Sequence, residues 1–284
     1  MPKMSMERYF PYYQGTPFFS LQQDSRFSYC LYVPPSYYRD EVKQVRLIVA
    51  VHGTKRTAEG YRDAFASLAE ETGCVVMAPL FPMGVSAPYA AAPEEQHNYK
   101  YLEFKGIRFD QSLIAMVGQV REALGKIAPE FLLFGFSGGG QFVHRFYYLH
   151  PERLLGVSVG APGSVTRIDP DVEWWPGTAG VAERFGKAID IAALRRVPVH
   201  LVVGALDTET WNVRIKPDSW TWREGANDAG ANRVERLEAL RQNLESHGID
   251  VTLDSVAGVA HSGTQVLNPV FDFFRKCLAQ KDRK

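Results

Sequence analysis

The sequence predicts an α/β protein built on a mostly parallel central sheet with helices on both faces. Apolar runs of strand length alternate along the chain with segments whose apolar residues recur at helical spacing, which is typical of strand–helix–strand units. Several apolar runs, such as Val45–Val51, are nearly continuous, as in strands that a parallel sheet buries on both faces. A chain of 284 residues suits a single domain of this class, covering residues 1–284.

Three strands and two helices are expected before residue 125. The strands cover residues 28–33, 45–51 and 75–78. A helix over 57–71 places Tyr61, Phe65 and Leu68 on one face, and Gly73 is suited to end it. A second helix over 109–124 has an apolar stripe formed by Leu113, Val117, Val120 and Leu124.

The alternation of strands and helices continues from residue 131 onward. Strands are expected at 131–134, 154–159, 199–203 and 249–256. Helices are expected at 141–149, 234–244 and 267–278.

Three segments do not follow the alternation, namely 84–104, 167–197 and 208–230. Long irregular connections inside a compact domain are usually lids or binding loops. We expect these insertions to form a cap or a pocket wall on the domain.

Ser137 is the most informative residue of the chain. It lies in the run Gly135-Phe136-Ser137-Gly138-Gly139, directly after an apolar strand and before a helical pattern. Gly-x-Ser-x-Gly between a strand and a helix is the nucleophile elbow of serine hydrolases, because the tight turn needs small residues around the serine. The sequence therefore predicts Ser137 as a nucleophile that needs a base, an acid and an oxyanion site.

His261 is the predicted base. It follows the last expected strand, and loops at the carboxyl ends of parallel strands converge above the sheet. The chain order Ser, acid, His also favours it. The other histidines have structural interpretations, except that His97 lies in an insertion where it could touch substrate; they are His52, His97, His144, His150, His200 and His247.

Asp207 is the predicted acid, because it ends the run that leads out of the strand 199–203. A carboxylate there can accept the second imidazole N–H of His261 and stabilise the imidazolium. Asp190 is the main rival, although it lies in an expected helix. Four more aspartates are weaker alternatives: Asp169, Asp171, Asp228 and Asp254.

The oxyanion site needs backbone N–H groups directed at the developing charge. The residue after the nucleophile, Gly138, supplies one of them. Thr54, in the His52-Gly53-Thr54 turn after the strand 45–51, is the predicted source of the other. His52 is interpreted as a structural imidazole that shapes this loop.

Together these motifs resemble the α/β-hydrolase superfamily. The elbow, the His52-Gly53 turn, Asp207 and His261 follow one another in that order over about residues 25–278. The resemblance implies the α/β-hydrolase fold and serine hydrolase chemistry. The glycines 138–140 and the run 204–207 loosely resemble the branch of polyhydroxybutyrate depolymerases and feruloyl esterases.

Aromatic residues gather in the insertions. All five tryptophans, Trp174, Trp175, Trp211, Trp220 and Trp222, flank the strand of Asp207, and Tyr89, Tyr99 and Tyr101 crowd the first insertion. Tyr99 and the five tryptophans are candidates for the walls of a substrate pocket. The alternative is that they anchor loops that have no core of their own.

The predicted function is hydrolysis of a small or medium carboxylic ester through an acyl-enzyme, with no cofactor and no metal. A peptidase, a thioesterase or a carbon–carbon bond hydrolase would use the same residues, because a fold does not determine a substrate. A non-catalytic ligand-binding protein on a hydrolase scaffold is the alternative of another class.

Composition and charge limit which classes of partner and which cellular location are expected. The formal net charge is +0, which gives no indication of nucleic acid or an anionic membrane, and no apolar run approaches the roughly 20 residues of a membrane span. Three widely spaced cysteines and a leader without an apolar signal core favour a reduced, cytoplasmic protein, with a removed signal peptide left open. The aromatic leader 9–19 is expected to pack on the body or on a partner subunit of a homo-oligomer.

Overall fold

The computed structural model describes residues 12–86 and 93–281, so Tyr89 and residues 9–11 of the leader lie outside the described residues. The strands are β1 (Gln14–Gly15), β2 (Phe19–Ser20), β3 (Ser28–Val33), β4 (Val45–Val51), β5 (Val75–Leu80), β6 (Glu103–Phe104), β7 (Ile107–Arg108), β8 (Ile127–Phe136), β9 (Leu154–Gly160), β10 (Val199–Gly204) and β11 (Val251–Val256). The α-helices are α1 (Ala58–Ala64), α2 (Ala66–Thr72), α3 (Phe109–Leu124), α4 (Gly138–Leu149), α5 (Val181–Phe185), α6 (Ile191–Leu194), α7 (Arg233–Ser246) and α8 (Leu267–Lys281). Short 3₁₀ helices are η2 (Pro35–Tyr38), η3 (Pro93–His97) and η4 (Pro151–Arg153).

The central sheet has the order β1-β3-β5-β4-β8-β9-β10-β11, and β2 also pairs with β3. Every pair from β5 to β11 along this order is parallel, whereas β3 pairs antiparallel with β5 and with the two short strands. The predicted mostly parallel sheet is thus confirmed. β1 and β2 were not predicted, because two residues are too few to show a hydrophobic period.

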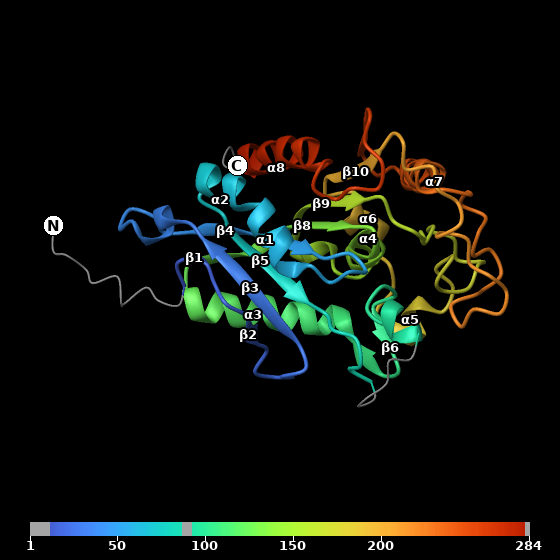
Figure 1. Cartoon of the computed structure of the whole chain (residues 1–284), viewed down its shortest axis with the longest axis horizontal. Helices are drawn as coiled ribbons and strands as arrows, with labels where there is room; N and C mark the ends of the chain where they lie inside the picture. The colour runs from blue at the N-terminus through green and yellow to red at the C-terminus, as the bar shows by residue number, and fades with distance from the viewer. Residues whose placement is uncertain (1–11, 87–92, 282–284) are drawn as a thin grey trace.

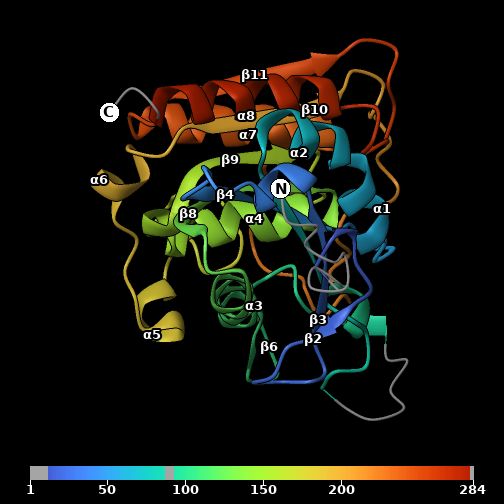
Figure 2. The ribbon, with the colours of Figure 1, turned by 90° about the vertical axis from the view of Figure 1, so that its left-hand side faces the viewer.

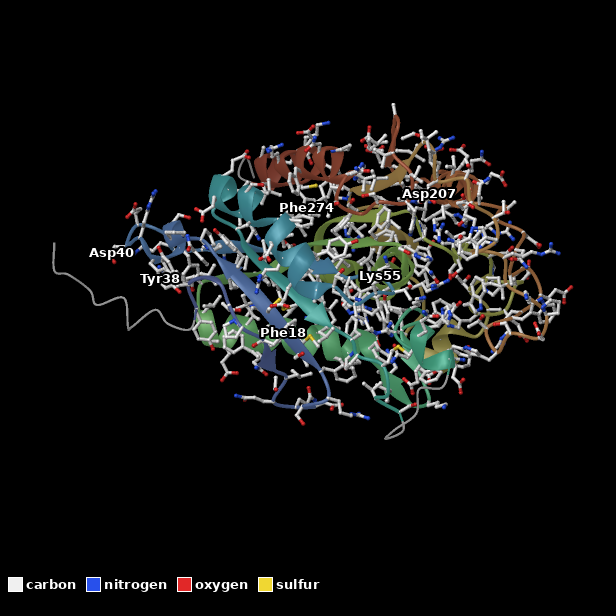
Figure 3. All side chains as sticks on the ribbon, viewed as in Figure 1. Phe18, Tyr38, Asp40, Lys55, Asp207 and Phe274 are labelled. Carbon is white, nitrogen blue, oxygen red and sulfur yellow. The ribbon has the colours of Figure 1, made fainter. Side chains whose placement is uncertain are left out.

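Helices cover both faces of the sheet, as predicted (Figures 1 and 2). α1, α2 and α8 share one face, where Phe65 packs on Phe271 of α8 with ring centroids 5.1 Å apart. Phe274 of the same helix, which is labelled in Figure 3, has its ring centroid 6.2 Å from that of Phe65. α3 and α4 share the other face, where Phe81 contacts both Phe109 and Phe142. One hydrophobic core therefore extends through both sides of the sheet.

Three predicted elements near Phe65 and Ser137 differ from the observed ones at their boundaries. The expected helix 57–71 is two helices, because the backbone at Phe65 (φ −90°, ψ −3°) leaves the helical path while its ring is fully buried. Gly73, at φ +72°, ends α2 as predicted. The strand before Ser137 begins at Ile127 rather than at 131, and the helix after it begins at Gly138 rather than at 141.

The three insertions gather at one end of the molecule, which is on the right in Figure 1. The first contains η3 and leads into the β6–β7 hairpin, the second contains α5 and α6, and the third is built of turns. Loops at the carboxyl ends of β4, β8, β10 and β11 lead toward the same end, so the insertions border the residues that follow those strands.

The leader packs on the body of the same chain. Tyr12 stacks on Phe19 at 5.0 Å and its carbonyl accepts the Tyr38 hydroxyl, whereas Phe18 is 38% exposed. Cys30, Cys74 and Cys277 are buried, and none forms a disulfide. Within the described ranges, no helix is long and apolar enough to cross a lipid bilayer.

Candidate active site

Ser137 occupies a strained turn between β8 and α4. Its φ of 58° and ψ of −113° lie outside the regions that residues other than glycine normally adopt. The turn is held in place because the Ser137 N–H donates to the carbonyl of Gly160 on β9 at 2.8 Å. Strain of this kind persists only where the surroundings over-determine it, and it is concentrated at functional sites.

The glycines around Ser137 are required by space. A Cβ on Gly135 would lie 2.4 Å from the carbonyl oxygen of Gly139, and one on Gly139 would lie 2.3 Å from that of Val51. A Cβ on Gly138 would lie 2.5 Å from the Tyr99 hydroxyl. Backbone cannot move aside cheaply, so the Gly-rich sequence is the one that lets α4 begin against β4.

His261 and Asp207 are hydrogen-bonded to each other. The His261 Nδ1–H donates to Asp207 Oδ2 at 2.6 Å, which leaves Nε2 of the imidazole free for the cavity side. The side chain of Asp207 is fully buried, whereas that of His261 is 31% exposed. The second oxygen of Asp207 accepts from Arg233 Nη1 at 3.1 Å. The carboxylate is therefore fixed from both sides.

Tight turns after β10 and β11 bring this pair together. The N–H of Leu206 donates to the carbonyl of Val259 at 2.8 Å, so the two loops are joined directly. Gly204 is needed at this contact, since a Cβ there would lie 2.3 Å from the Val259 carbonyl oxygen. Gly258, at φ +73°, provides the left-handed turn that precedes His261.

Ser137 and His261 line one cavity of about 830 Å³, with Asp207 buried behind His261. The ring of His261 packs on Phe136, the neighbour of Ser137, with centroids 4.8 Å apart. Lys55 and Asp207 both lie toward the end of the molecule where the insertions gather (Figure 3). The structure thus brings the three sequence-predicted residues to one site.

The turn after β4 forms another wall. Gly53 and Thr54 line the cavity, and a Cβ on Gly138 would lie 3.1 Å from Thr54 Oγ1, so Thr54 and Gly138 face each other. His52 is fully buried: its Nε2 accepts from the Phe81 N–H at 3.0 Å and its Nδ1–H donates to Gly53 O at 2.8 Å. Burial lowers the pKa of His52 to about 3, so this imidazole is a neutral brace of the turn.

The alternative acids and bases have partners elsewhere. Asp190 caps α6 by accepting from the Ala193 N–H at 3.0 Å. Asp254 contacts His200 at 3.1 Å, and His200 in turn contacts Ser158 at 2.9 Å. This second row of Ser, His and Asp is closed to a substrate, because Ser158 and His200 are fully buried within the sheet.

The aromatic candidates are placed unequally. Trp211, 78% exposed, lines the cavity, and so does Tyr101. The other five candidate side chains are not among the lining residues; they are Tyr99, Trp174, Trp175, Trp220 and Trp222. The second insertion, 167–197, contributes no lining residue within the part of the chain that the structure describes.

Tyr99 and Trp175 are buried and anchor neighbouring loops, whereas Trp220 and Trp222 are 42% and 39% exposed. The Tyr99 hydroxyl donates to His52 O at 3.0 Å, in the turn that His52, Gly53 and Thr54 form. Trp175 Nε1 donates to the carbonyl of Thr221 at 2.7 Å, which ties the second insertion to the third. Trp220 packs on Phe104 at 5.1 Å.

Cationic residues in the cavity wall were missed by the sequence analysis. Lys100 and Arg233 are buried there, and Lys100 Nζ donates to His97 Nδ1 at 2.9 Å. Burial and the nearby arginines lower the pKa of Lys100 to about 7, and burial with the Lys100 charge lowers that of His97 to about 3. No local pattern marks a lysine between two tyrosines or an arginine at a helix start as a site residue.

No protein-family model matches the chain, and no curated protein matches its sequence. Solved structures that are similar to this chain were found. The chain is 22% identical to a poly(3-hydroxybutyrate) depolymerase from Bordetella parapertussis, over 87% of this chain and 83% of that one, with a TM-score of 0.68. It is 24% identical to poly(aspartic acid) hydrolase-1 from Sphingomonas sp. KT-1, over 87% and 92%, with a TM-score of 0.66.

A ferulic acid esterase is also similar, at 12% identity over 93% of this chain and 98% of the other, with a TM-score of 0.59. These neighbours are ester and polymer hydrolases. The chain has the α/β-hydrolase fold, as the resemblance in its motifs implies.

Proposed function

We propose that this protein is a serine hydrolase that cleaves a small or medium carboxylic ester through an acyl-enzyme. The observation that carries the proposal is the strained Ser137 in the wall of a cavity that it shares with His261, whose imidazole is hydrogen-bonded to a buried carboxylate. A serine hydroxyl becomes a useful nucleophile when such a base takes its proton.

Acylation begins when Ser137 Oγ attacks the ester carbonyl and His261 Nε2 accepts its proton. Asp207 holds the imidazole in the required tautomer and stabilises the imidazolium. The negative charge on the carbonyl oxygen is stabilised by the N–H groups of Gly138 and Thr54, which face each other across the site.

Collapse of this intermediate breaks the bond to the alcohol, which leaves with the proton of His261. Water then enters, His261 Nε2 takes one of its protons, and attack on the acyl-enzyme releases the acid and restores Ser137. The cavity of about 830 Å³ is within the usual size range of pockets for small ligands.

A fluorophosphonate probe tests the nucleophile directly. We expect covalent labelling of Ser137 in the folded protein, identified by mass spectrometry of the labelled peptide. The variant Ser137→Ala should not be labelled, and its kcat on a short p-nitrophenyl ester should fall by about 10³-fold or more. A folded protein that is neither labelled nor active would favour a ligand-binding protein over an enzyme.

The bond that is cleaved requires a separate comparison. We expect p-nitrophenyl esters to be hydrolysed faster than matched anilides and thioesters. Faster turnover of the anilide would indicate a peptidase, and faster turnover of the thioester a thioesterase. A carbon–carbon bond hydrolase would leave all three nearly untouched while still accepting the fluorophosphonate.

A further inference from the structure

The cavity wall is strongly cationic, although the whole chain has a formal net charge of +0. Among the described residues, five cations and one carboxylate line it: Lys55, Lys100, Arg214, Lys216, Arg233 and Asp218. The cations are at two depths. Lys55, Arg214 and Lys216 are exposed at the rim, whereas Lys100 and Arg233 are buried beside the residues that Ser137 needs.

Lys100 lies next to the oxyanion turn. Its Cε is 3.0 Å from the position that a Cβ on Gly138 would take. Within the described part of the chain, its Nζ donates to the neutral His97, and the charges that act on it most are those of Arg56, Arg233 and Arg145. Burying an ammonium among other cations is costly, since a buried charge is normally paired.

Arg233 lines the same cavity and is 5% exposed. Its Nη1 is shared between Asp207 Oδ1 at 3.1 Å and Asn212 Oδ1 at 3.2 Å. Its Nε is buried and has no hydrogen-bond partner among the described residues. Asp207 is already paired with His261, so it cannot balance both cations.

The other carboxylates near this cluster are either exposed, as Glu209 and Asp218 are, or already hydrogen-bonded. Glu95 is fully buried, but its charge interacts with the guanidinium of Arg56. Its carboxylate also accepts hydrogen bonds from the N–H of Gly84 and from the Asn98 amide. Arg145 is held by neutral groups, including Thr166 Oγ1 and the carbonyl of Lys100. Among the described residues, no buried carboxylate is therefore left to pair with Lys100, and a bound anion could supply that counter-charge.

We infer that the ester bound in this cavity carries a carboxylate, and that Lys100 and Arg233 pair with it beside the reacting carbonyl. This inference rests on the proposed function and names its substrate class. Because both cations lie close to the reacting centre, the carboxylate is only a few bonds from the ester group. The rim cations attract such an anion to the cavity before it is bound.

The test compares matched charged and neutral esters. Monoethyl glutarate carries the charge on the acyl side and diethyl glutarate is its neutral counterpart. The acetyl ester of 3-hydroxybutyrate carries the charge on the alcohol side, with its methyl ester as the counterpart. We expect kcat/KM per ester bond to favour the charged member of at least one pair by about tenfold or more, which also reports on which side the carboxylate lies.

Lys100→Met should lower this preference by about 10- to 100-fold, because a charge-assisted hydrogen bond is lost, and should act mainly through KM. Lys43→Met, which removes an exposed lysine outside the cavity lining, is the matched control and should leave the preference unchanged. A charged-to-neutral ratio of kcat/KM near one in the wild-type protein would overturn the inference. So would an equal loss of kcat/KM on charged and neutral esters in Lys100→Met.

Binding without turnover separates this inference from the proposed function. In Ser137→Ala, calorimetry with monoethyl glutarate or acetoxybutyrate should show binding that weakens with added salt and is lost on adding Lys100→Met. Equal binding of the charged and neutral esters would reject the anion site even if the wild-type protein hydrolyses both. Salt-sensitive binding without any hydrolysis by the wild type would reject the proposed function alone.

Discussion

Both oxygens of Asp207 have donors, and this makes the residue hard to replace. An asparagine can turn its one oxygen toward His261 or toward Arg233, and its amide group then faces a donor on the other side. The same problem does not arise at Asp190, whose oxygen accepts a backbone N–H at the start of α6, a position where asparagine is equally good.

Asp207→Asn is therefore expected to reduce kcat by about 10³- to 10⁴-fold. The imidazolium of His261 loses its stabilising charge, and the neutral imidazole is no longer held in the required tautomer. The measurement is steady-state hydrolysis of a p-nitrophenyl ester, with circular dichroism to verify folding. Asp190→Asn is the matched control and should retain nearly full activity. If the two variants exchanged these outcomes, Asp190 would be the acid.

Lys100 makes stability depend on pH. Its pKa is lowered from the ordinary value of 10.5 to about 7 in the folded protein, mainly by burial. Well below pH 7 it is charged in both states, so the cost of burying the charge is present in full. Between pH 7 and 10.5 the unfolded chain binds more protons than the folded chain, and this contribution to stability improves as pH rises.

Lys100→Met should accordingly stabilise the protein most below pH 7, by a few kcal/mol, equivalent to a rise in Tm of about 5 °C or more. The gain should shrink as the pH approaches 10. Thermal unfolding of both proteins from pH 6 to pH 10 measures the difference. A gain that is constant with pH would show that Lys100 is neutral, or well solvated, throughout.

At the scale of the elements, α4 contacts β4 and β9 so closely that its first turn allows only glycine. A Cβ on Gly139 would lie 2.3 Å from the carbonyl oxygen of Val51, and one on Gly140 equally close to that of Gly160. These contacts hold the helix against the strands and help to keep Ser137 in its strained conformation. The Gly-rich run is thus a packing requirement as well as a turn signal.

Gly139→Ala should destabilise the fold by more than about 2 kcal/mol, because backbone has to shift to accept the methyl group. Gly118→Ala, inside α3 with open space around its Cα, should instead stabilise by roughly 0.5–1 kcal/mol through helix propensity. Urea unfolding measures both changes. A neutral Gly139→Ala would show that α4 can move away from β4 at little cost.

Whether an element could be predicted from the sequence depended on the length of its hydrophobic pattern. The buried strands and the amphipathic α3 were predicted because their hydrophobic periods are long. The break at Phe65 was missed, since Tyr61, Phe65 and Leu68 keep helical spacing across it. The short β6–β7 hairpin was missed because its strands have two residues each.

For the molecule as a whole, Arg145 is the link between α4 and the cavity walls. It is fully buried, it donates to Lys100 O at 2.9 Å and to Ser164 Oγ at 3.1 Å, and its guanidinium lies over Tyr101 at 4.6 Å. Through these contacts one side chain positions the first insertion and the loop after β9. That insertions and sheet form a single domain over 1–284 stays a prediction.

Arg145→Met should leave these buried acceptors unpaired, lowering the free energy of unfolding by at least about 2 kcal/mol and raising KM more than it lowers kcat. Limited proteolysis should cut faster within 93–104 and 208–230. Arg121→Met, on the exposed face of α3, is the control and should change neither property. Unchanged proteolysis in Arg145→Met would show that the aromatic anchors alone hold the insertions.

The sequence by itself determined the sheet, the helices on its two faces and the positions of Ser137, Asp207 and His261, because hydrophobic periods and glycine-flanked turns are local signals. Tertiary structure alone decided that Trp211 lines the cavity while Trp174 and Trp175 are buried away from it, and that Lys100 and Arg233 line the same cavity. Burial and charge pairing between distant segments depend on how the chain packs, and no short-range pattern encodes them. The cationic residues of the cavity wall therefore had to be found in the structure.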